Sequence, residues 1–202
     1  MASEIQWSLL PPLTVATRAV LAVTAYRNSR RAGLALVEAM HGIDEALLAG
    51  LGDEMFSTAV LAQLDTDSGL LKWVNGGHHE PLLLRDGKFV KTLHLDPRPP
   101  LGLGYLRDSQ PMPVGNEQLE PGDQILLYTD GVVEARSPSG EFFGIDRLAD
   151  LVIRHLAGGL PAPETMRRAV RELFERQQGP LGDDASLLLL QWHGSQPARC
   201  ED

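Results

Sequence analysis

Apolar residues recur at helical spacing in four segments, two near each end of the chain. The first helix is predicted from Thr14, the second after Gly33 and the third after Gly144, while the fourth follows the glycines and prolines of residues 158–163. Such spacing places apolar residues on one helix face, so each pair of helices is expected to cover another layer. The positions that define these faces are Val15, Ala19, Ala22, Val23 and Tyr26; Leu36, Met40, Ile43, Leu47 and Leu51; Leu148, Leu151 and Val152; Met166, Ala169, Val170, Leu173 and Phe174.

Between the helical pairs, short apolar runs alternate with turn residues. The turn sequences at residues 66–69 and at Asp86-Gly87 lie between β-prone runs and predict two hairpins. The strands predicted in this part of the chain are residues 56–65, 70–75, 81–85, 88–93 and 112–119. Helices, antiparallel strands, helices and a final strand together predict an α+β fold of packed sheets covered by helical pairs.

Two further apolar runs are the most informative strands. Residues 124–129 end at Asp130, and residues 185–192 begin directly after Asp183 and Asp184. The second run is almost entirely apolar, which is typical of a strand buried on both faces. If the two strands are antiparallel neighbours, the end of the first meets the start of the second. Asp130 and Asp183 would then lie at one edge of the sheet.

The composition is that of an ordinary globular protein. With 202 residues, 43% of them hydrophobic and 22% charged, the chain is expected to form a single domain over residues 1–194, followed by a polar tail at 195–202. The net charge of -9 argues against a nucleic-acid surface, which needs clustered Lys and Arg. No apolar run approaches the roughly 18 residues of a membrane span, and no signal peptide is recognisable. A cytoplasmic protein without a membrane or nucleic-acid partner is therefore expected.

The aspartates at the strand ends are the candidate metal ligands. Carboxylates are hard oxygen ligands, and because no His or Cys cluster accompanies Asp130, Asp183 and Asp184, Mg²⁺ or Mn²⁺ is favoured over Zn²⁺. Two such ions can hold a water in line with a phosphoryl group. The residues also allow a purely structural role, in which Asp130 closes a turn and the other two cap a loop. Taken alone, they favour that structural role.

Other polar residues are weaker candidates. His78 and His79 follow two glycines and could bind phosphate or metal, but histidines in such a turn usually contact solvent or backbone. Glu134 and Arg136 are expected to serve structure near the carboxylates. No Ser, His and Asp arrangement with a nucleophile elbow is recognisable.

Several short motifs follow one another in a characteristic order. They are N-G-G-H at residues 75–78, P-L-G-L at 100–103, L-E-P-G-D at 119–123, Y-T-D-G-V-V-E-A-R at 128–136, G-E-F-F-G at 140–144 and D-D-A-S at 183–186. From about Leu13 to Trp192, the chain resembles the SpoIIE-type branch of the metal-dependent PP2C-like protein serine/threonine phosphatases.

The resemblance implies an α-β-β-α sandwich of antiparallel sheets flanked by helical pairs. It also implies a hydrolase of signal transduction that removes phosphate from phosphoserine or phosphothreonine with a metal-activated water. The implied substrate is a small phosphorylated regulatory protein of the anti-sigma antagonist type, and the implied cofactor is Mn²⁺ or Mg²⁺. Asp130 and Asp183 match metal-binding aspartates of the family, and Asp184 matches a position where relatives often have Asp or Asn.

One part of the family pattern is missing. Relatives carry a Gly-Asp and an Asp-x-x-Gly-His-Gly motif ahead of the first helix, whereas Leu13 already resembles that helix directly after residues 9–12. An internal gap after about residue 12 is therefore expected, with loss of strands and of two carboxylates. This leaves two hypotheses: a phosphatase that uses the remaining aspartates, and a catalytically impaired relative that acts as a protein-binding regulatory module. Exposed sheet edges would also favour a homo-oligomer.

Overall fold

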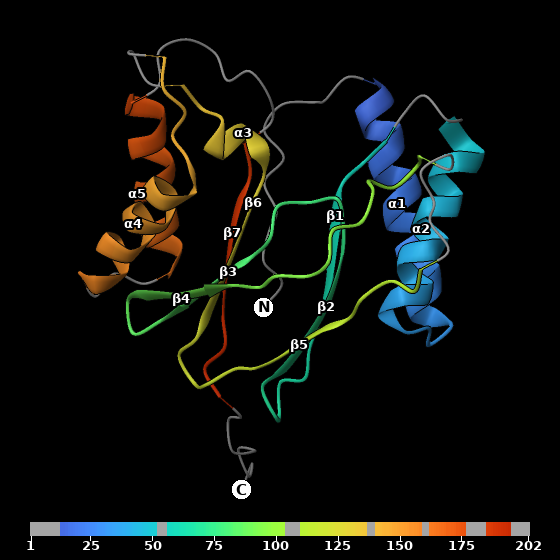
Figure 1. Ribbon diagram of the computed structural model, residues 1–202, viewed down its shortest axis with the longest axis horizontal. Coiled ribbons are helices and arrows are strands. Elements are labelled where there is room, and N and C mark those ends of the chain that lie inside the picture. Colours follow the sequence, from blue (N-terminus) through green and yellow to red (C-terminus); the bar gives the residue numbers. More distant parts are fainter. Residues whose placement is uncertain are drawn as a thin grey trace, which may run out of the picture. The chain divides into compact units, whose positions relative to one another are not determined.

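The computed structural model describes residues 13–51, 56–103, 110–136, 140–158, 162–176 and 185–194 (Figure 1). The helices are α1 (Leu13–Arg31), α2 (Leu36–Leu51), α3 (Asp130–Val133), α4 (Ile145–Ala157) and α5 (Ala162–Arg176). The strands are β1 (Ala59–Leu64), β2 (Leu70–Gly76), β3 (Leu82–Arg85), β4 (Lys88–Thr92), β5 (Gly115–Gln118), β6 (Gln124–Tyr128) and β7 (Leu187–Gln191). The four longer helices and all seven strands were predicted, whereas α3 was not.

The strands form two sheets. One has the order β1-β2-β5 and the other the order β4-β3-β6-β7. In the second sheet, β3 pairs antiparallel with both β4 and β6, and β6 pairs antiparallel with β7. Both predicted hairpins are present as neighbouring strands, and β5 is shorter than the predicted strand at residues 112–119. The predicted α+β class with antiparallel strands and two helical pairs is confirmed.

The chain divides into two compact units, which are described separately. The first comprises Met1–Ala62, Trp73–Gly77 and Pro97–Val114, and the second comprises Gln63–Lys72, His78–Asp96 and Gly115–Asp202. The single domain expected for residues 1–194 stays a prediction, and so does the expected gap, because residues 1–12 lie outside the described part. The polar tail at 195–202 lies outside it as well. None of the described helices has the length and apolarity needed to cross a membrane.

In the first unit, α1 and α2 pack side by side (Figure 1). The apolar core of this unit includes Met40 and Leu47 of α2 and Val74 of β2, all of them buried. One predicted core position is wrong, because Val23 is 55% exposed. The side of α1 that packs against this core includes Ala22 and Tyr26, as predicted, together with Leu21 and Ala25.

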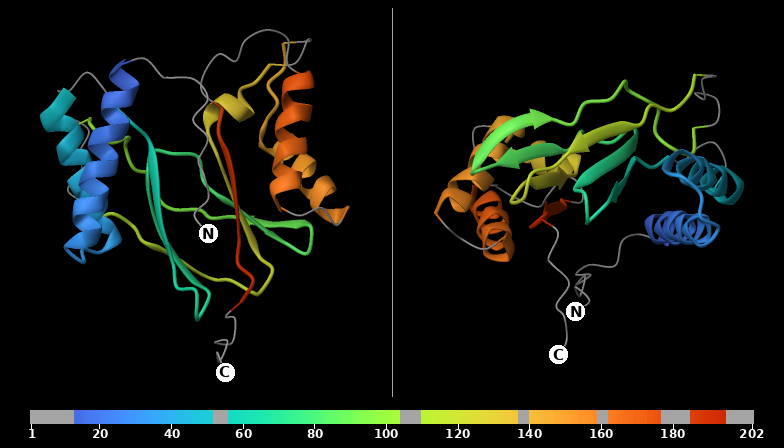
Figure 2. Two further views of the ribbon diagram at one scale, coloured as in Figure 1. Left: turned by 180° about the vertical axis from the view of Figure 1, so that it is seen from behind. Right: turned by 90° about the horizontal axis from the view of Figure 1, so that it is seen from below.

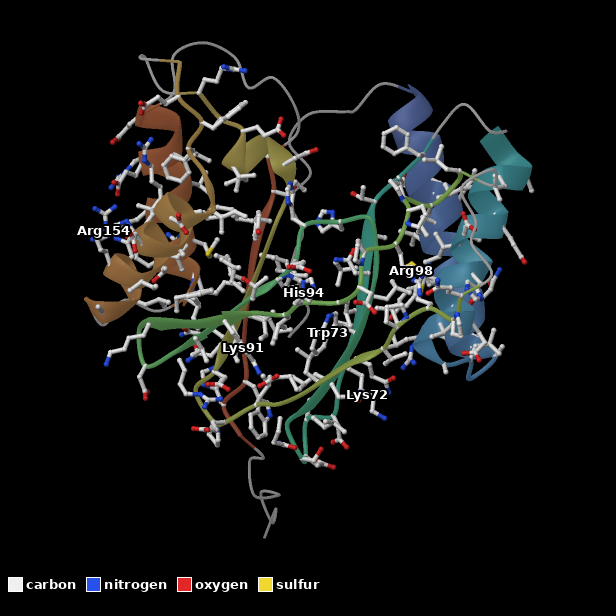
Figure 3. All side chains as sticks on the ribbon, in the orientation of Figure 1. Lys72, Trp73, Lys91, His94, Arg98 and Arg154 are labelled. Atoms are coloured by element: carbon white, nitrogen blue, oxygen red, sulfur yellow. The ribbon has the colours of Figure 1, made fainter. Side chains whose placement is uncertain are left out.

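In the second unit, α4 and α5 lie side by side in both views of Figure 2 and contact the four-stranded sheet. The core between them includes Leu126 of β6 and Leu148 of α4, both fully buried. At the helix surface, Arg154 of α4, labelled in Figure 3, pairs with Glu172 of α5 at 3.2 Å. Apolar packing thus holds the helical pair to the sheet, with charged residues outside it.

The last strand differs from its prediction on one face. Leu187 and Leu189 pack against the helical core, but Leu188 is 60% exposed. Successive side chains of a strand point to opposite faces, so the faces of β7 have different surroundings. The strand was predicted to be buried on both faces, and this is wrong for the described structure, in which β7 is also an edge strand.

Candidate functional site

The site is organised by the pairing of β6 with β7. Tyr128, the last residue of β6, lies opposite Leu187, the first residue of β7. Just beyond them, the Thr129 N–H donates to the Ser186 carbonyl at 3.1 Å, and the Ser186 N–H donates to Thr129 Oγ1 at 2.8 Å. The predicted antiparallel pairing is therefore confirmed. The end of the first strand meets the start of the second.

Asp130 begins the one-turn helix α3 and is exposed. Its Oδ1 accepts a hydrogen bond from the Gly131 N–H at 2.8 Å, and its carbonyl accepts one from the Glu134 N–H at 2.8 Å. Thr129 precedes it in an extended conformation, which turns the chain from strand to helix. A turn was predicted at Asp130, and the structure has a short helix that begins at this residue. Its carboxylate lies at the surface, where a cation can reach it.

The other two predicted ligands, Asp183 and Asp184, lie outside the described residues. Ala185 is the first described residue after them, and the next residue, Ser186, is bonded to Thr129 as given above. Across the described ranges, no three His, Cys, Asp or Glu side chains form a group that could hold a metal ion. Asp130 fits a Mn²⁺ or Mg²⁺ ligand by its chemistry and exposure. A complete metal centre would also need Asp183 and Asp184, which stay predicted ligands.

Two histidines lie next to this end of β6. His79 stacks on the Tyr128 ring, with 5.4 Å between ring centroids. His78 interacts electrostatically with Asp130 and hydrogen-bonds the Tyr128 backbone, and both raise its pKa. Burial of His78 and the charge of His79 lower the pKa more strongly, so the net shift is downward. His78 is therefore mainly neutral at pH 7.

The position of these histidines follows from strand register. Leu82 of β3 pairs with Leu126 of β6, and continuing that antiparallel register backwards brings position 78 opposite position 130. His78 was a weak candidate by its sequence, because its local turn does not reveal which residues lie opposite it. Knowledge of the β3–β6 pairing would have identified it as a neighbour of Asp130.

Acidic and aromatic groups surround the same region. Burial, together with the charge of Glu80, raises the pKa of Tyr128 to about 12, so its hydroxyl stays protonated. Glu80 in turn contacts His94, whose Nδ1 lies 2.6 Å from the Glu80 Oε1 (Figure 3). Glu80 thus interacts with both Tyr128 and His94.

The opposite end of β6 contains a second aspartate in very different surroundings. Asp123 is fully buried and accepts two hydrogen bonds from Arg85, each 2.7 Å long. It also accepts the Glu120 N–H at 2.8 Å. Burial by itself raises the pKa of Asp123, but the Arg85 and Glu120 hydrogen bonds and the Arg85 charge outweigh it and lower the pKa. Donors of the protein itself thus bind this carboxylate, and its role is structural.

A small hairpin follows α3. The Phe143 N–H donates to the Ala135 carbonyl at 2.8 Å, and the Gly144 N–H donates to the Val133 carbonyl at 2.9 Å. Arg136 lies opposite Phe142 in this hairpin. The expectation that Glu134 and Arg136 serve structure holds in part, because Glu134 donates its N–H to Asp130 and Arg136 donates to the Gly140 carbonyl.

The first unit contains a separate cavity of about 280 Å³. Its lining includes His41, Asp44 and Arg98, the last labelled in Figure 3. The Asp44 carboxylate is buried and accepts the Gly102 N–H at 2.6 Å. Asp130, the predicted site residue that the structure describes, is not among the residues that line this cavity.

Comparison with known proteins gives a consistent result. The family model described as stage II sporulation protein E (SpoIIE) matches residues 13–193. The phosphoserine phosphatase RsbU of Bacillus subtilis is 29% identical over 136 residues, which cover 67% of this chain and 39% of RsbU. The chain thus spans well under half the length of this relative.

Solved structures resemble the protein over most of its length. The crystal structure of the RsbU and RsbW domains of Rv1364c from Mycobacterium tuberculosis matches with a TM-score of 0.76 and 27% identity, covering 94% of this chain and 52% of that one. The SiaA-PP2C domain of Pseudomonas aeruginosa matches with a TM-score of 0.75 and 23% identity, covering 89% of this chain and 71% of that one. At that lower identity the second match concerns the fold alone.

Proposed function

Because the chain belongs to the SpoIIE family of PP2C-like protein serine/threonine phosphatases, we propose that it hydrolyses phosphoserine or phosphothreonine on a small regulatory protein. The relative RsbU is named a phosphoserine phosphatase, which supports the reaction. An anti-sigma antagonist type of substrate is part of the proposal, as is dependence on Mn²⁺ or Mg²⁺. A bound divalent cation would supply an activated water and stabilise charge on the phosphoryl group.

The observation that carries this proposal is the meeting of two strand ends. The mutual hydrogen bonds between Thr129 and Ser186 join the segment that leads into Asp130 to the segment that follows Asp183 and Asp184. In this proposal Asp130 and Asp183 are the principal metal ligands, and Asp184 is the secondary one. His78 supports the arrangement, because its lowered pKa keeps it neutral and avoids a positive charge beside the cation.

The test is Mn²⁺-dependent hydrolysis of p-nitrophenyl phosphate by the purified chain and by Asp130→Asn. Loss of a metal ligand is expected to reduce turnover by at least about 100-fold, since even outer residues of metal sites contribute 10- to 100-fold. Asp150→Asn is the matched control, because it removes an exposed carboxylate of α4 outside the proposed site. It should retain wild-type turnover.

A wild-type sample that is folded yet no more active than Asp130→Asn would contradict the proposed enzyme activity. That result would favour the second hypothesis, a catalytically impaired relative that serves as a protein-binding regulatory module. Circular dichroism of all three proteins would establish that they are equally folded.

Assembly into a homo-oligomer is the remaining part of the proposal. It is supported by β7, an edge strand of the described sheet in which Leu188 is 60% exposed. Apolar edge strands without charged residues are prone to pair with another chain. Leu188→Lys should shift an oligomer toward monomer in sedimentation velocity, and a wild type that stays monomeric at high concentration would contradict this proposal.

A further inference from the structure

The hairpin after α3 carries an arginine with unusual surroundings. Arg136 is exposed, and its Nη1 donates to the Gly140 carbonyl at 3.1 Å. Its guanidinium carbon lies 4.4 Å from the centroid of the Phe142 ring. Within the described structure, no carboxylate pairs with it.

The other arginines of the second unit contrast with Arg136. Among those whose side chains are described, each makes an ion pair with Asp or Glu. They are Arg85, Arg147, Arg154, Arg167, Arg168 and Arg171. In a protein with 27 acidic and 18 basic residues, carboxylates are abundant enough to neutralise most cations. The exposed Arg136 guanidinium, which pairs with none of the described carboxylates, can donate hydrogen bonds to an external anion.

Phe142 and its neighbours complete a small surface. The Phe142 side chain is 52% exposed although it is aromatic, and Ile145, three positions later, is 41% exposed. Arg147 holds the backbone nearby, because its Nη1 donates to the Phe142 carbonyl at 3.4 Å and its Nη2 lies 3.3 Å from a Glu141 oxygen. A cationic group and an exposed aromatic ring thus occur together on the hairpin, and the exposed Ile145 begins the helix that follows it.

This combination suits an acidic peptide. A guanidinium presents a planar fork that binds a carboxylate through two hydrogen bonds, and stacking on an aromatic ring fixes the plane of that fork. Exposed aromatic side chains contribute apolar contact at binding surfaces. Because the chain carries a net charge of -9, an acidic ligand needs a local cation, and Arg136 provides one beside the Phe142 ring.

The hairpin is also tied to the candidate site. Its first strand continues directly from α3, which begins with Asp130, and the Gly144 N–H bonds back to Val133 of that helix. Arg136 and Phe142 are thus connected through α3 to the segment that begins with Asp130.

We propose that Arg136 and Phe142 form a docking platform for an acidic segment that flanks the phosphorylated residue of the protein substrate. Arg136 binds a carboxylate of that segment, and Phe142 with Ile145 contacts an adjacent apolar side chain. The platform selects among substrates and takes no part in the chemical step. This inference rests on the proposed phosphatase function, and its test separates the two.

The probe is a fluorescein-labelled peptide that contains phosphoserine followed by aspartates and a leucine. Its binding is measured by fluorescence anisotropy without added metal, and its hydrolysis is measured with Mn²⁺ beside that of p-nitrophenyl phosphate. The variants are Arg136→Ala, Arg136→Lys and Phe142→Ala. Arg171→Ala is the matched control, because it removes another exposed arginine of the same unit.

We expect Arg136→Ala to weaken peptide binding about tenfold and to raise KM for the peptide by a similar factor, as loss of one charge-assisted bidentate contact implies. The ratio of peptide to aryl phosphate turnover should fall accordingly. Arg136→Lys should restore binding only in part, because lysine keeps the charge but lacks the planar fork. Arg171→Ala should match the wild type.

Failures of the two proposals give different results. If the wild type binds the peptide without turning it over, and Arg136→Ala loses that binding, the platform is supported and the enzyme activity is contradicted. Turnover by wild type with equal peptide affinity and KM in Arg136→Ala would overturn the platform alone. Inhibition of binding by inorganic phosphate but not by an unphosphorylated acidic peptide would also overturn it, because the phosphoryl group and not the carboxylates would then be the ligand.

Discussion

The two ends of β6 each carry an aspartate, and their surroundings are opposite. Asp123 is fully buried between the two hydrogen bonds from Arg85 and the Glu120 N–H. Asp130 is exposed, and within the described part of the chain its carboxylate accepts a hydrogen bond from its own neighbour Gly131. One strand therefore holds a carboxylate whose lone pairs are used by the protein and another whose lone pairs are accessible from outside.

This contrast shows what distinguishes a structural aspartate from a candidate ligand. Both residues border the same apolar strand and both lie next to glycine, so their local sequences are similar. The difference arises from partners that are distant in the chain, since Arg85 lies 38 positions before Asp123. Burial with complete hydrogen bonding gives stability, whereas exposure at a strand end allows chemistry.

The largest expected effect is on stability at the Asp123 end. Asp123→Ala removes two charge-assisted hydrogen bonds from Arg85 and one bond from the Glu120 N–H, and we expect a loss of about 3 kcal/mol in unfolding free energy although Arg85 keeps its ion pair with Glu120. Asp130→Ala, the matched substitution at the other end, should change it by no more than about 0.5 kcal/mol. Urea denaturation followed by circular dichroism measures both. Equal destabilisation by the two substitutions would remove the contrast.

A somewhat smaller effect is expected where Trp192 packs on Gly69, beside Asp123. Gly69 has a φ of +77°, and a Cβ there would lie 2.3 Å from the Trp192 ring, so Gly69→Ala should cost about 2–3 kcal/mol. Gly122→Ala is the control, since its φ is +99° but nothing lies within 4 Å of a Cβ. It should show backbone strain alone, about 1 kcal/mol. Equal losses of stability for the two variants in thermal denaturation would mean that the Trp192 ring moves aside without a cost in free energy.

The pH dependence of stability should also distinguish the ends. The folded-state pKa of Asp123 lies below its ordinary value of 3.8, so its contribution is fully present above that value and is lost as pH falls through the folded pKa. Urea midpoints of wild type and Asp123→Ala should therefore differ at pH 6 and converge as the pH is lowered below about 4. A constant difference over that range would assign the effect of the substitution to packing.

The smallest expected effect concerns the junction at the Asp130 end. Thr129→Val removes the hydrogen bond from the Ser186 N–H to the Thr129 hydroxyl, with an expected loss of about 1 kcal/mol. Thr129→Ser keeps a hydroxyl and should lose less. Hydrogen exchange of the Ser186 amide reports on this bond directly. Unchanged exchange in Thr129→Val would mean that the strand pairing alone protects the amide.

Much of the fold could be predicted because local signals agreed with the final arrangement. Asp86-Gly87 connects β3 and β4 as expected of a hairpin turn, and the residues after Gly144 form α4. Helix α3 could not be predicted, because a single turn has too few residues for a periodic pattern and its backbone bonds determine it. Leu188 was misjudged because an apolar strand sequence does not reveal whether a neighbour covers each face.

The site was predictable only in part. The meeting of Thr129 with Ser186 followed from pairing two apolar strands, while the expected proximity of Asp130 and Asp183 stays a prediction. The proximity of His78 to Asp130 depends on the register of β3 against β6, which no local motif encodes. Arg136 was expected to serve structure, which its bond to Gly140 supports in part, but the sequence does not show which arginines pair with a carboxylate. Such pairings depend on side chains from separate elements.

The most direct test of the central claim, that the Asp130 end of β6 binds a divalent cation and the Asp123 end does not, is a Mn²⁺ titration followed by electron paramagnetic resonance. Wild type should reduce the signal of free Mn²⁺, and Asp130→Asn and Asp183→Asn should each lose that binding. Asp123→Asn, measured under conditions where it is folded, should retain it. Equal Mn²⁺ affinity in wild type and Asp130→Asn would contradict the account.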